Sequence, residues 1–348
     1  MKYCPFLKLK KNELLALKEL EPGINSNIVP FFDLPFNQNK SADSVLHTIN
    51  TGIGHLDRHW KKDKQFYIDT YDIPDKIRIK NKHVYLVLLN KLKEYEYIPV
   101  IGINRIQEHN DAILTVDASK KISKIAIRLT PDDFDDFDLI KLELSELKKQ
   151  FSVKKFDLIF DCRVIINSKR ANELVDRIRD FLSDSKNSGQ YERTLVTGSS
   201  IFANFSEIIK PGEYVKITQH ERNIFNSLIG ANSNLIYSDY CIISPEYSDA
   251  NISSKIIQKV STPKLLYTEN DSIHIFRGKS LTLDERGRKQ YFDLAKKIAK
   301  SNYFRGKDYG VGDRFIFERS LELINPSDQG TWYRKLINCH ITYIYKTH

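Results

Sequence analysis

Short apolar runs of strand length alternate with longer amphipathic segments along most of the 348-residue chain. The longer segments repeat apolar residues three and four positions apart, a period typical of helices that bury one face. These helices are predicted at residues 12–20, 41–60, 83–95, 111–120, 137–150, 168–182, 219–229 and 287–301. The apolar runs predict eight strands, near residues 28–33, 66–69, 98–104, 124–129, 156–161, 193–198, 235–243 and 265–277.

The alternation of strand and helix predicts the class of fold. Repeats of this kind indicate right-handed crossovers between parallel strands. Because eight parallel strands close a barrel, we expect an α/β fold of the (β/α)8, TIM-like barrel type. An open, doubly wound sheet is the alternative. Against it, the first predicted strand and its loop, NIVPFFDLPFNQNKS, contain no glycine, whereas that fold usually carries a glycine-rich phosphate loop there.

The pattern is less regular after Ser200. The segment PKLLYTENDSIHIFRG is either one interrupted strand, counted here as the eighth of the barrel, or a hairpin that turns at Asn270 and Asp271. The tail includes GTWYRKLINCHITYIY, whose end is expected to be a strand. We therefore expect one domain, with residues 1–302 as the barrel and residues 303–348 as a C-terminal elaboration packed on it.

Composition narrows the class of protein without naming a reaction. The net charge of +9 comes from 54 basic and 45 acidic residues. That balance permits a nucleotide or nucleic acid as partner but does not require one. Four scattered cysteines without a C-x-x-C pair favour free thiols in a reducing cytoplasm. No apolar stretch is long enough to span a membrane, and no signal peptide is expected.

Charged residues recur where the predicted strands end. In a barrel of this type, catalytic groups lie at the carboxyl ends of the strands. The candidates for catalysis are Asp33, Asp69, Asp161 and Asp239, and those for ligand binding at strand ends are Arg105, Arg128, Arg163 and Arg277. Arginine suits phosphate or carboxylate groups, and aspartates can hold a divalent cation such as Mg²⁺ or act as general acid or base. The alternative is structural, because strands also end in charges simply where they meet solvent.

Two residues of the run FDLIFDCR illustrate the expectation. Asp161 and Arg163 are two positions apart, so on a continuing strand both face the barrel interior. Asp157 lies at the amino end of the same run, where a structural role is expected. The pair therefore marks the end of the strand that should open into the barrel mouth.

Two further segments are candidates for anion binding. The turn TGSS includes Ser199, whose hydroxyl can help to hold an anion, although Gly-Ser-Ser is also an ordinary turn. HIFRGK supplies Arg277 and Lys279 after the expected eighth strand, where barrels often bind phosphate. The histidines show no metal-ligand spacing; His55 and His59 are four residues apart but lack an H-E-x-x-H pattern.

Four segments together resemble the beta-protein family, which occurs in bacteria, their phages and mobile elements. They are YCPFLKLKKNELLALKEL followed by IVPFFDL, then SDYCIISP, YGVGDRFI and TWYRKLINCHITYI. Ser238 stands where that family usually has glycine, and Cys339-His340 where His-His is expected, which weakens any role that needs both imidazoles. The resemblance spans nearly the whole chain. It implies a barrel-like α/β architecture and gene neighbourhoods linked to mobile elements or defence, but no established reaction.

The block that carries this resemblance adds three candidate ligand-binding residues, Trp332, Arg334 and His340. Tryptophan and arginine can stack on and pair with a base-bearing ligand. The alternative is a C-terminal strand that packs its aromatic residues across the barrel.

Three hypotheses for function follow. The first is a phage-defence or mobile-element component whose barrel mouth binds a phosphate-containing ligand, a nucleotide or nucleic acid, with metal-assisted hydrolysis. The second is a non-catalytic sensor that holds a protein encoded nearby or a nucleic acid. The third, a structural phage component, is the least supported because the chain has no repeats.

Overall fold

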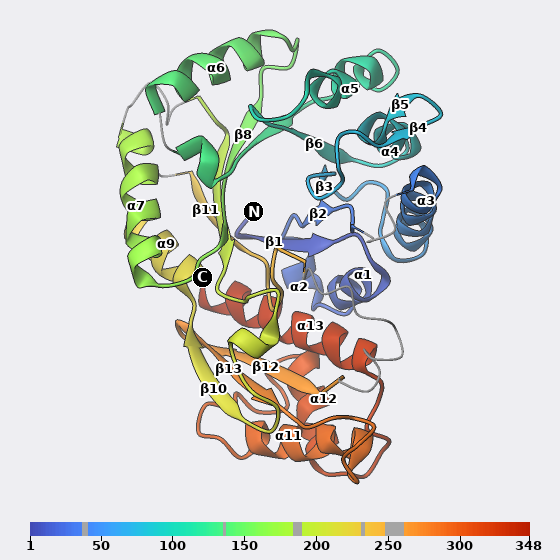
Figure 1. Ribbon diagram of the computed structural model, residues 1–348, viewed down its shortest axis with the longest axis vertical. Helices are drawn as coiled ribbons and strands as arrows, with labels where there is room; N and C mark the ends of the chain where they lie inside the picture. Colours follow the sequence, from blue (N-terminus) through green and yellow to red (C-terminus); the bar gives the residue numbers. More distant parts are fainter. Residues whose placement is uncertain (37–40, 135–136, 184–189, 231–233, 248–260) are drawn as a thin grey trace.

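The computed structural model describes residues 1–36, 41–134, 137–183, 190–230, 234–247 and 261–348. Eight parallel strands close a barrel in the order β1-β11-β9-β8-β7-β6-β3-β2 (Figure 1). The strands are β1 (Tyr3–Lys8), β2 (Phe31–Asp33), β3 (Phe66–Asp69), β6 (Tyr97–Ile101), β7 (Ile125–Leu129), β8 (Phe156–Val164), β9 (Arg193–Ser199) and β11 (Leu235–Asp239). The predicted α/β barrel is confirmed, and the alternative of an open sheet is excluded.

Helices surround the barrel on its outer side (Figure 1). They are α1 (Lys11–Lys18), α2 (Pro22–Asn25), α3 (Ala42–His59), α4 (Val84–Lys91), α5 (Gln107–Asp117), α6 (Phe137–Lys149), α7 (Ser168–Ser183) and α9 (His220–Leu228). A short hairpin of β4 (Arg78–Ile79) and β5 (Lys82–His83) precedes α4. The periodic apolar positions of α3 and α7 bury Val45, Ile49 and Leu174, as their sequence pattern predicts.

The expected eighth barrel strand at residues 265–277 is wrong, and β1 takes its place. Tyr3 to Pro5 of β1 pair with β11, and Phe6 to Lys8 pair with β2, so β1 closes the ring. Residues 264–277 instead form the hairpin that was the alternative prediction. Its strands β12 (Lys264–Glu269) and β13 (Ser272–Arg277) join β10 (Tyr214–Thr218) in a separate antiparallel sheet.

Three helices pack with this second sheet beside the barrel (Figure 1, orange and red). They are α11 (Gln290–Ala299), α12 (Val311–Ser320) and α13 (Gln329–Thr347). The expected C-terminal strand is wrong, because α13 is helical to its end. Trp332, Leu336 and Ile344 are buried along this helix, and the side chain of Asp328 accepts a hydrogen bond from the Thr331 N–H at its start. The boundary expected at residue 302 stays a prediction.

The barrel interior is filled with side chains and is not a pore. Phe6 and Phe31 stack with ring centroids 4.0 Å apart, and Tyr240 packs edge-on against Phe6. At the amino end of the strands, the Asp157 carboxylate accepts hydrogen bonds from Tyr67 (2.7 Å) and Lys124 (3.3 Å). Because the described interior is packed, we look for a site at the carboxyl ends of the strands, where barrels of this type carry theirs.

A buried glutamate, Glu221 of α9, lies beside the turn that follows β9. Its carboxylate accepts hydrogen bonds from the Ser200 hydroxyl (2.6 Å) and the Gln219 amide (3.4 Å). Ser200 Oγ in turn accepts the His220 N–H at 2.8 Å. Burial raises the pKa of Glu221 to about 7. Ionising this group at neutral pH is therefore unfavourable in the folded state.

We expect Glu221→Gln to change how stability depends on pH. Between about pH 4.5 and 7 the native state holds a proton that the unfolded state has lost, so stability falls as pH rises through that window. The Gln variant removes this titration, and we expect it to gain about 2–3 kcal/mol relative to wild type on going from pH 5 to pH 8. Urea denaturation at both pH values measures the effect, and an equal pH dependence in the two proteins would contradict it.

Candidate functional site

Residues at the carboxyl ends of β2, β3, β7 and β8 form one buried ion network, which we call the mouth network. Its inner members are Asp33, Asp69, Arg128 and Asp161, each at most 4% exposed. Parallel strands bring their carboxyl ends to the same rim, which is why residues 128 positions apart in sequence meet here. The expectation that these four side chains converge is confirmed.

Arg128 lies at the centre of the network and uses its whole guanidinium. Nη1 donates to Asp33 and Asp69, both at 2.9 Å, while Nε and Nη2 donate to Asp161 at 3.0 and 2.6 Å. Nη2 also donates to the Tyr240 hydroxyl at 2.9 Å. Burial alone would disfavour this charge, but the surrounding acidic groups, Asp33 foremost, hold the pKa of Arg128 above its usual value.

A second layer of charges surrounds the inner one. Lys8 pairs with Asp33 (3.5 Å) and Asp72, and Arg105 donates to Asp69 at 2.6 Å. Arg163 lies 3.6 Å from Asp161 and 3.8 Å from Asp72. This outer layer is richer in cations, whereas the inner layer is richer in carboxylates. The network as a whole contains as many acidic as basic side chains. The acids are Asp72 and the three inner aspartates, and the bases are Lys8 and three arginines.

The ring of Tyr71 lies among the three arginines of the network. Its centroid is 4.4 Å from the guanidinium carbon of Arg128, 4.7 Å from that of Arg163 and 5.3 Å from that of Arg105. Cations favour positions over the face of an aromatic ring. Tyr71 is partly exposed, so it separates the buried Arg128 from solvent and leaves Arg105 and Arg163 nearer the opening.

The electrostatics of the mouth act in opposite directions on Asp33 and Asp72: burial raises the pKa of Asp72 above its usual value. Burial raises the pKa of Asp33, but the charges of Arg128 and Lys8 outweigh it, so that pKa lies below its usual value. Both Asp161 oxygens are in use, because Oδ1 also accepts the backbone N–H of Arg163 at 3.0 Å. The Arg128 guanidinium thus takes the central position that a cation held by Asp33, Asp69 and Asp161 would need.

The chain bends at Arg163, where β8 meets the mouth. Arg163 has φ of 54°, and the pairing of β8 with β9 shifts register between Asp161 and Val164. Such a bulge re-aims side chains at a barrel rim. It lets Arg163 reach the Pro245 carbonyl at 3.1 Å while staying beside Asp161. Both residues reach the mouth, as expected.

Two cavities lie at this end of the barrel. The first, of about 330 Å³, is polar and is lined by Asp69, Tyr71, Ile101, Gly102, Asn104, Arg105, Arg128, Thr130, Asp132 and Asp133. The second, of about 310 Å³, lies between the barrel and the second sheet, with Lys8, Glu13, Tyr247, Lys264 and Trp332 in its wall. Burial raises the pKa of Glu13 to about 7 and lowers that of Lys264 to about 8. The mouth network borders both cavities through Arg128 and Lys8.

Asp239 ends barrel strand β11 but points away from the mouth. Its carboxylate accepts hydrogen bonds from the Tyr3 hydroxyl, the Cys241 N–H at 2.9 Å and His340 Nε2 at 2.9 Å. His340 Nδ1 pairs with the Thr268 hydroxyl at 2.7 Å. This fully buried chain links β11 to α13 and β12. It accounts structurally for Asp239 and His340, and their expected roles at a ligand remain predictions.

The remaining candidates also lie outside the mouth. Arg277 was expected after the eighth barrel strand, but it lies in β13 and donates to Thr262 Oγ1 (3.1 Å) and the Ile209 carbonyl (2.6 Å). The location of Arg277 and of the exposed Lys279 therefore removes the argument for a phosphate site at those two residues. The Ser199 hydroxyl donates to the Ile243 carbonyl at 2.8 Å.

The two other candidates on α13 make contacts typical of packing. Trp332 is 1% exposed, stacks on Tyr291 with centroids 5.1 Å apart, and donates from Nε1 to the Pro326 carbonyl. Arg334 lies 3.5 Å from Glu19. The packing interpretation of this block is therefore the one that its contacts favour, on a helix in place of the expected strand.

Sequence reasoning missed four members of the mouth: Lys8, Tyr71, Asp72 and Tyr240. Lys8 ends β1, which was not predicted as a strand. Tyr71 and Asp72 lie two and three positions after Asp69 in QFYIDTYD, just past the end of the predicted strand. Tyr240 follows Asp239 in SDYCII, where the residue facing the mouth is the tyrosine and not the aspartate.

Fold and site together define a closed (β/α)8 barrel whose mouth is occupied by a balanced network of buried ion pairs. The chain belongs to the Beta protein family, whose model matches residues 3–346. No curated protein and no solved structure matches the chain. Among the described helices, none is both long and apolar enough to cross a membrane.

Proposed function

We propose that the barrel mouth binds a small ligand that carries a phosphate group, such as a nucleotide. The observation that carries this proposal is the layering of the mouth network. The inner carboxylates are neutralised by Arg128, while Arg105 and Arg163 flank Tyr71 at the opening with 11% and 15% of their side chains exposed. An anion that reaches the polar cavity meets Arg105 first.

The opposite wall of the same cavity suits hydrogen-bond donors of the ligand. Asp132 is exposed there, and Asp133 accepts from Asn104 Nδ2 (2.5 Å) and the Thr130 N–H (2.6 Å). Amino and hydroxyl groups of a nucleotide can donate to such carboxylates, while its phosphate pairs with an arginine fork. A cavity of about 330 Å³ is of the size that small-molecule sites occupy.

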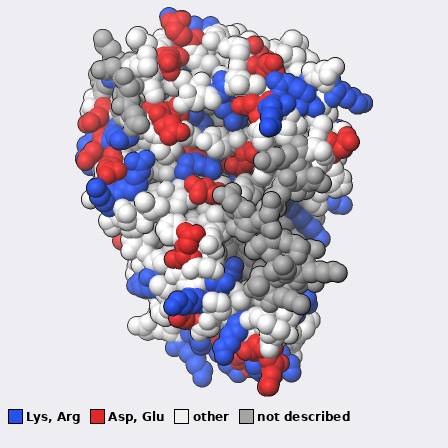
Figure 2. Space-filling view, in the orientation of Figure 1, with Lys and Arg blue, Asp and Glu red and all other residues white. Residues whose placement is uncertain are grey.

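The charge distribution favours a small ligand over a long nucleic acid. On the face of the molecule that Figure 2 shows, basic and acidic side chains of the described residues are interspersed, without one broad basic area. Binding along a nucleic-acid backbone usually relies on such an area. The net charge of +9 therefore gives no reason to extend the ligand beyond a nucleotide.

The proposal is for binding without hydrolysis at the inner aspartates. Asp33, Asp69 and Asp161 all accept hydrogen bonds from Arg128 and pair with its charge, and Arg128 stands where a divalent cation would bridge them. The gene neighbourhoods that the family resemblance implies would make such a phosphate-binding protein a sensor in a phage-defence or mobile-element system. Binding that changes how Tyr71 and Arg105 pack would provide the signal of such a sensor.

We expect Arg105→Ala to weaken binding of the ligand by at least tenfold. A charge-assisted hydrogen bond contributes about 1.5–3 kcal/mol, and about 1.4 kcal/mol corresponds to tenfold in affinity. Isothermal titration of the wild type with ATP and with inorganic pyrophosphate measures this, and chromatography of the recovered ATP shows whether it is intact. Asp69 keeps its pair with Arg128 in this variant, so we expect the protein to remain folded.

Arg179→Ala is the matched control, because Arg179 lies on the exposed face of α7 beside Asp176. It removes the same charge without touching the mouth and should bind as the wild type does. If neither anion binds to the wild type, or if the Arg105 and Arg179 variants bind equally well, the mouth is not the site. Conversion of ATP to ADP would contradict the proposal that the protein binds without hydrolysis.

A further inference from the structure

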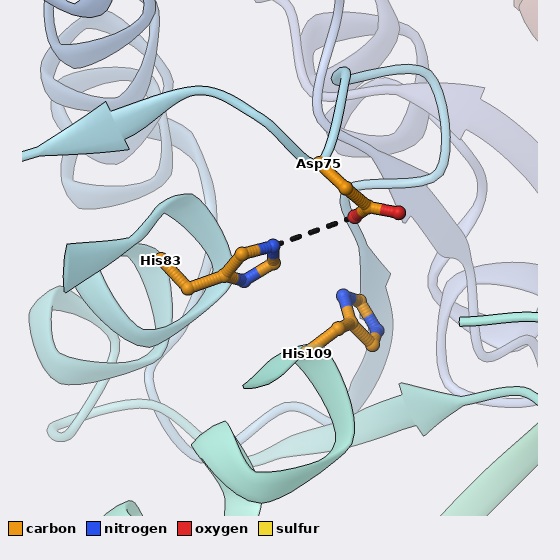
Figure 3. Close-up of side chains that lie close together, drawn as sticks. All are labelled: Asp75, His83 and His109. Carbon is orange, nitrogen blue, oxygen red and sulfur yellow. Dashed lines mark ion pairs between the residues drawn. The ribbon is translucent and has the colours of Figure 1, made fainter. Parts of the chain in front are cut away.

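Asp75, His83 and His109 form a cluster beside the mouth that the proposed function does not use (Figure 3). Asp75 comes from the segment between β3 and β4, His83 from β5 just before α4, and His109 from α5. One ligand atom of each residue lies within 4.8 Å of the others. Two imidazoles and a carboxylate are the ligand types that zinc and related transition metals prefer.

The tautomer of His109 follows from its neighbours. Its Nε2 lies 3.1 Å from the Val100 carbonyl oxygen, which only accepts, and 3.8 Å from Asp69 Oδ1. Arg105 Nη2, a donor, is 3.5 Å from the same nitrogen, but the shorter contact with the carbonyl requires the N–H there. Nε2 therefore carries the proton and Nδ1 carries the lone pair. Histidines that bind metals commonly donate their second ring N–H to a carbonyl or carboxylate in this way.

The lone pair of His109 meets no hydrogen-bond donor in the part of the chain that the structure describes. Nδ1 is buried and has no hydrogen-bond partner among the described residues, although His109 is 0% exposed. The ring is fixed by stacking on Tyr85, with centroids 4.1 Å apart and planes 2° apart. Figure 3 shows the ring turned toward the space between His83 and Asp75. A buried polar atom without a partner calls for a water or an ion.

His83 is oriented toward the same space. Its Nε2 lies 3.4 Å from Asp75 Oδ1, and its Nδ1 accepts the Tyr85 N–H at 3.3 Å at the start of α4. If a metal binds Nε2 of His83, the ring proton must lie on Nδ1 instead. Nδ1 can then no longer accept the long hydrogen bond from the Tyr85 N–H. The side chain of Asp75 is 35% exposed, so it can move to complete the site and leaves an approach from solvent.

A second group of possible metal ligands has neither an unused lone pair nor an approach from solvent. Asp239, Cys241 and His340 are also close together and all buried. Both nitrogens of His340 are already bonded, to Asp239 and Thr268, and no member is exposed to admit an ion. Of the two such groups among the described residues, the one at His109 combines an unused lone pair with an open side.

We propose that Asp75, His83 and His109 bind one divalent transition-metal ion of the zinc type, with water at the remaining position. Two ligands about 2.0–2.2 Å from a tetrahedral zinc ion lie roughly 3.4 Å apart. His83 Nε2 and Asp75 Oδ1 already have this spacing, and the partly exposed Asp75 side chain can adjust its position toward His109. His109 Nε2 contacts Asp69 and Arg105, whereas the metal would bind Nδ1 on the other side of the ring. The imidazole of His109 would therefore lie between the metal and these two residues of the mouth network. This site is independent of the proposed anion binding and can exist without it.

Titration of the EDTA-treated full chain with zinc chloride tests the proposal. We expect one zinc ion per chain in the wild type, and affinities at least about 100-fold weaker in His83→Ala and His109→Ala. Asp75→Asn keeps the size of a partly exposed side chain, so it should fold normally and bind at least about tenfold more weakly. His47→Ala removes an exposed histidine of α3 and should bind as the wild type does.

Cobalt gives an independent readout, because it reports its ligands by visible absorption. The wild type should show d–d bands that saturate at one equivalent, and Asp75→Asn should shift or lose them. Absence of stoichiometric binding in the wild type would overturn the proposal. So would Asp75→Asn and His83→Ala variants that are folded and bind zinc with wild-type affinity.

Discussion

Arg128→Ala is expected to destabilise the fold by at least about 4 kcal/mol at pH 7. Removing one partner of a buried ion pair typically costs about 3–5 kcal/mol, because the other charge remains buried and unpaired. Here three carboxylates lose the same partner: Asp33, Asp69 and Asp161. Each of these three carboxylates keeps one other cation within 4 Å, which reduces the loss of stability only in part. These cations are Lys8 for Asp33, Arg105 for Asp69 and Arg163 for Asp161. Urea denaturation measures the loss, with Arg179→Ala as the exposed control.

The same substitution has a characteristic dependence on pH. The pKa of Asp33 is lowered in the folded wild type, so its contribution is present above the unfolded pKa, near about 3.9, and is lost as pH falls through the folded value. In the variant the unpaired aspartates gain from protonation, so we expect the difference from wild type to shrink as pH falls toward 4. A difference below about 1 kcal/mol at pH 7 would show that Arg128 is not the centre of the network.

Asp239→Ala is expected to cost about 3–4 kcal/mol and to loosen the attachment of α13. The substitution leaves His340, the Tyr3 hydroxyl and the Cys241 N–H without their acceptor in a fully buried place. Asp239→Asn is the matched variant, because its amide oxygen can still accept, and we expect it to lose about half as much. Limited proteolysis shows whether α13 is released first.

The pKa of Asp239 gives this prediction a second check. Burial raises it, but the charge of His340 and the hydrogen bonds from His340 and Tyr3 outweigh burial and hold it below its usual value. The contribution of the carboxylate is therefore present above about pH 3.9 and disappears as pH falls further. Equal stability of the wild type and the Ala variant at pH 7 would contradict the structural role.

The sequence predicted the barrel because its physical signals are local. Each strand and helix of the repeat carries its own apolar period, and the carboxyl ends of parallel strands must share one rim. That geometry alone brought Asp33, Asp69, Arg128 and Asp161 together. The same geometry could not show that Asp239 points away from the mouth. Asp239 is held by His340 of α13, which lies about 100 residues further along the chain and reaches Asp239 only through tertiary packing.

The errors also have physical causes. Pro5 interrupts YCPFLK, and proline is usually a poor member of a sheet, yet here β1 changes its partner from β11 to β2 just after it. The run Ile341-Thr342-Tyr343-Ile344 favours strands by composition, but α13 is buried at every position from Leu336 to Ile344, and this packing outweighs that preference. His83 and His109 lie on separate elements, so only the tertiary fold places them at one point.

A crystal structure of the protein soaked with pyrophosphate tests the central claim most directly. The account predicts an anion in the polar cavity with its oxygens about 2.7–2.9 Å from the guanidinium of Arg105. It also predicts that Arg128 stays between Asp33, Asp69 and Asp161. A cation bridging these aspartates in place of Arg128, or an anion bound elsewhere with the mouth unchanged, would contradict it.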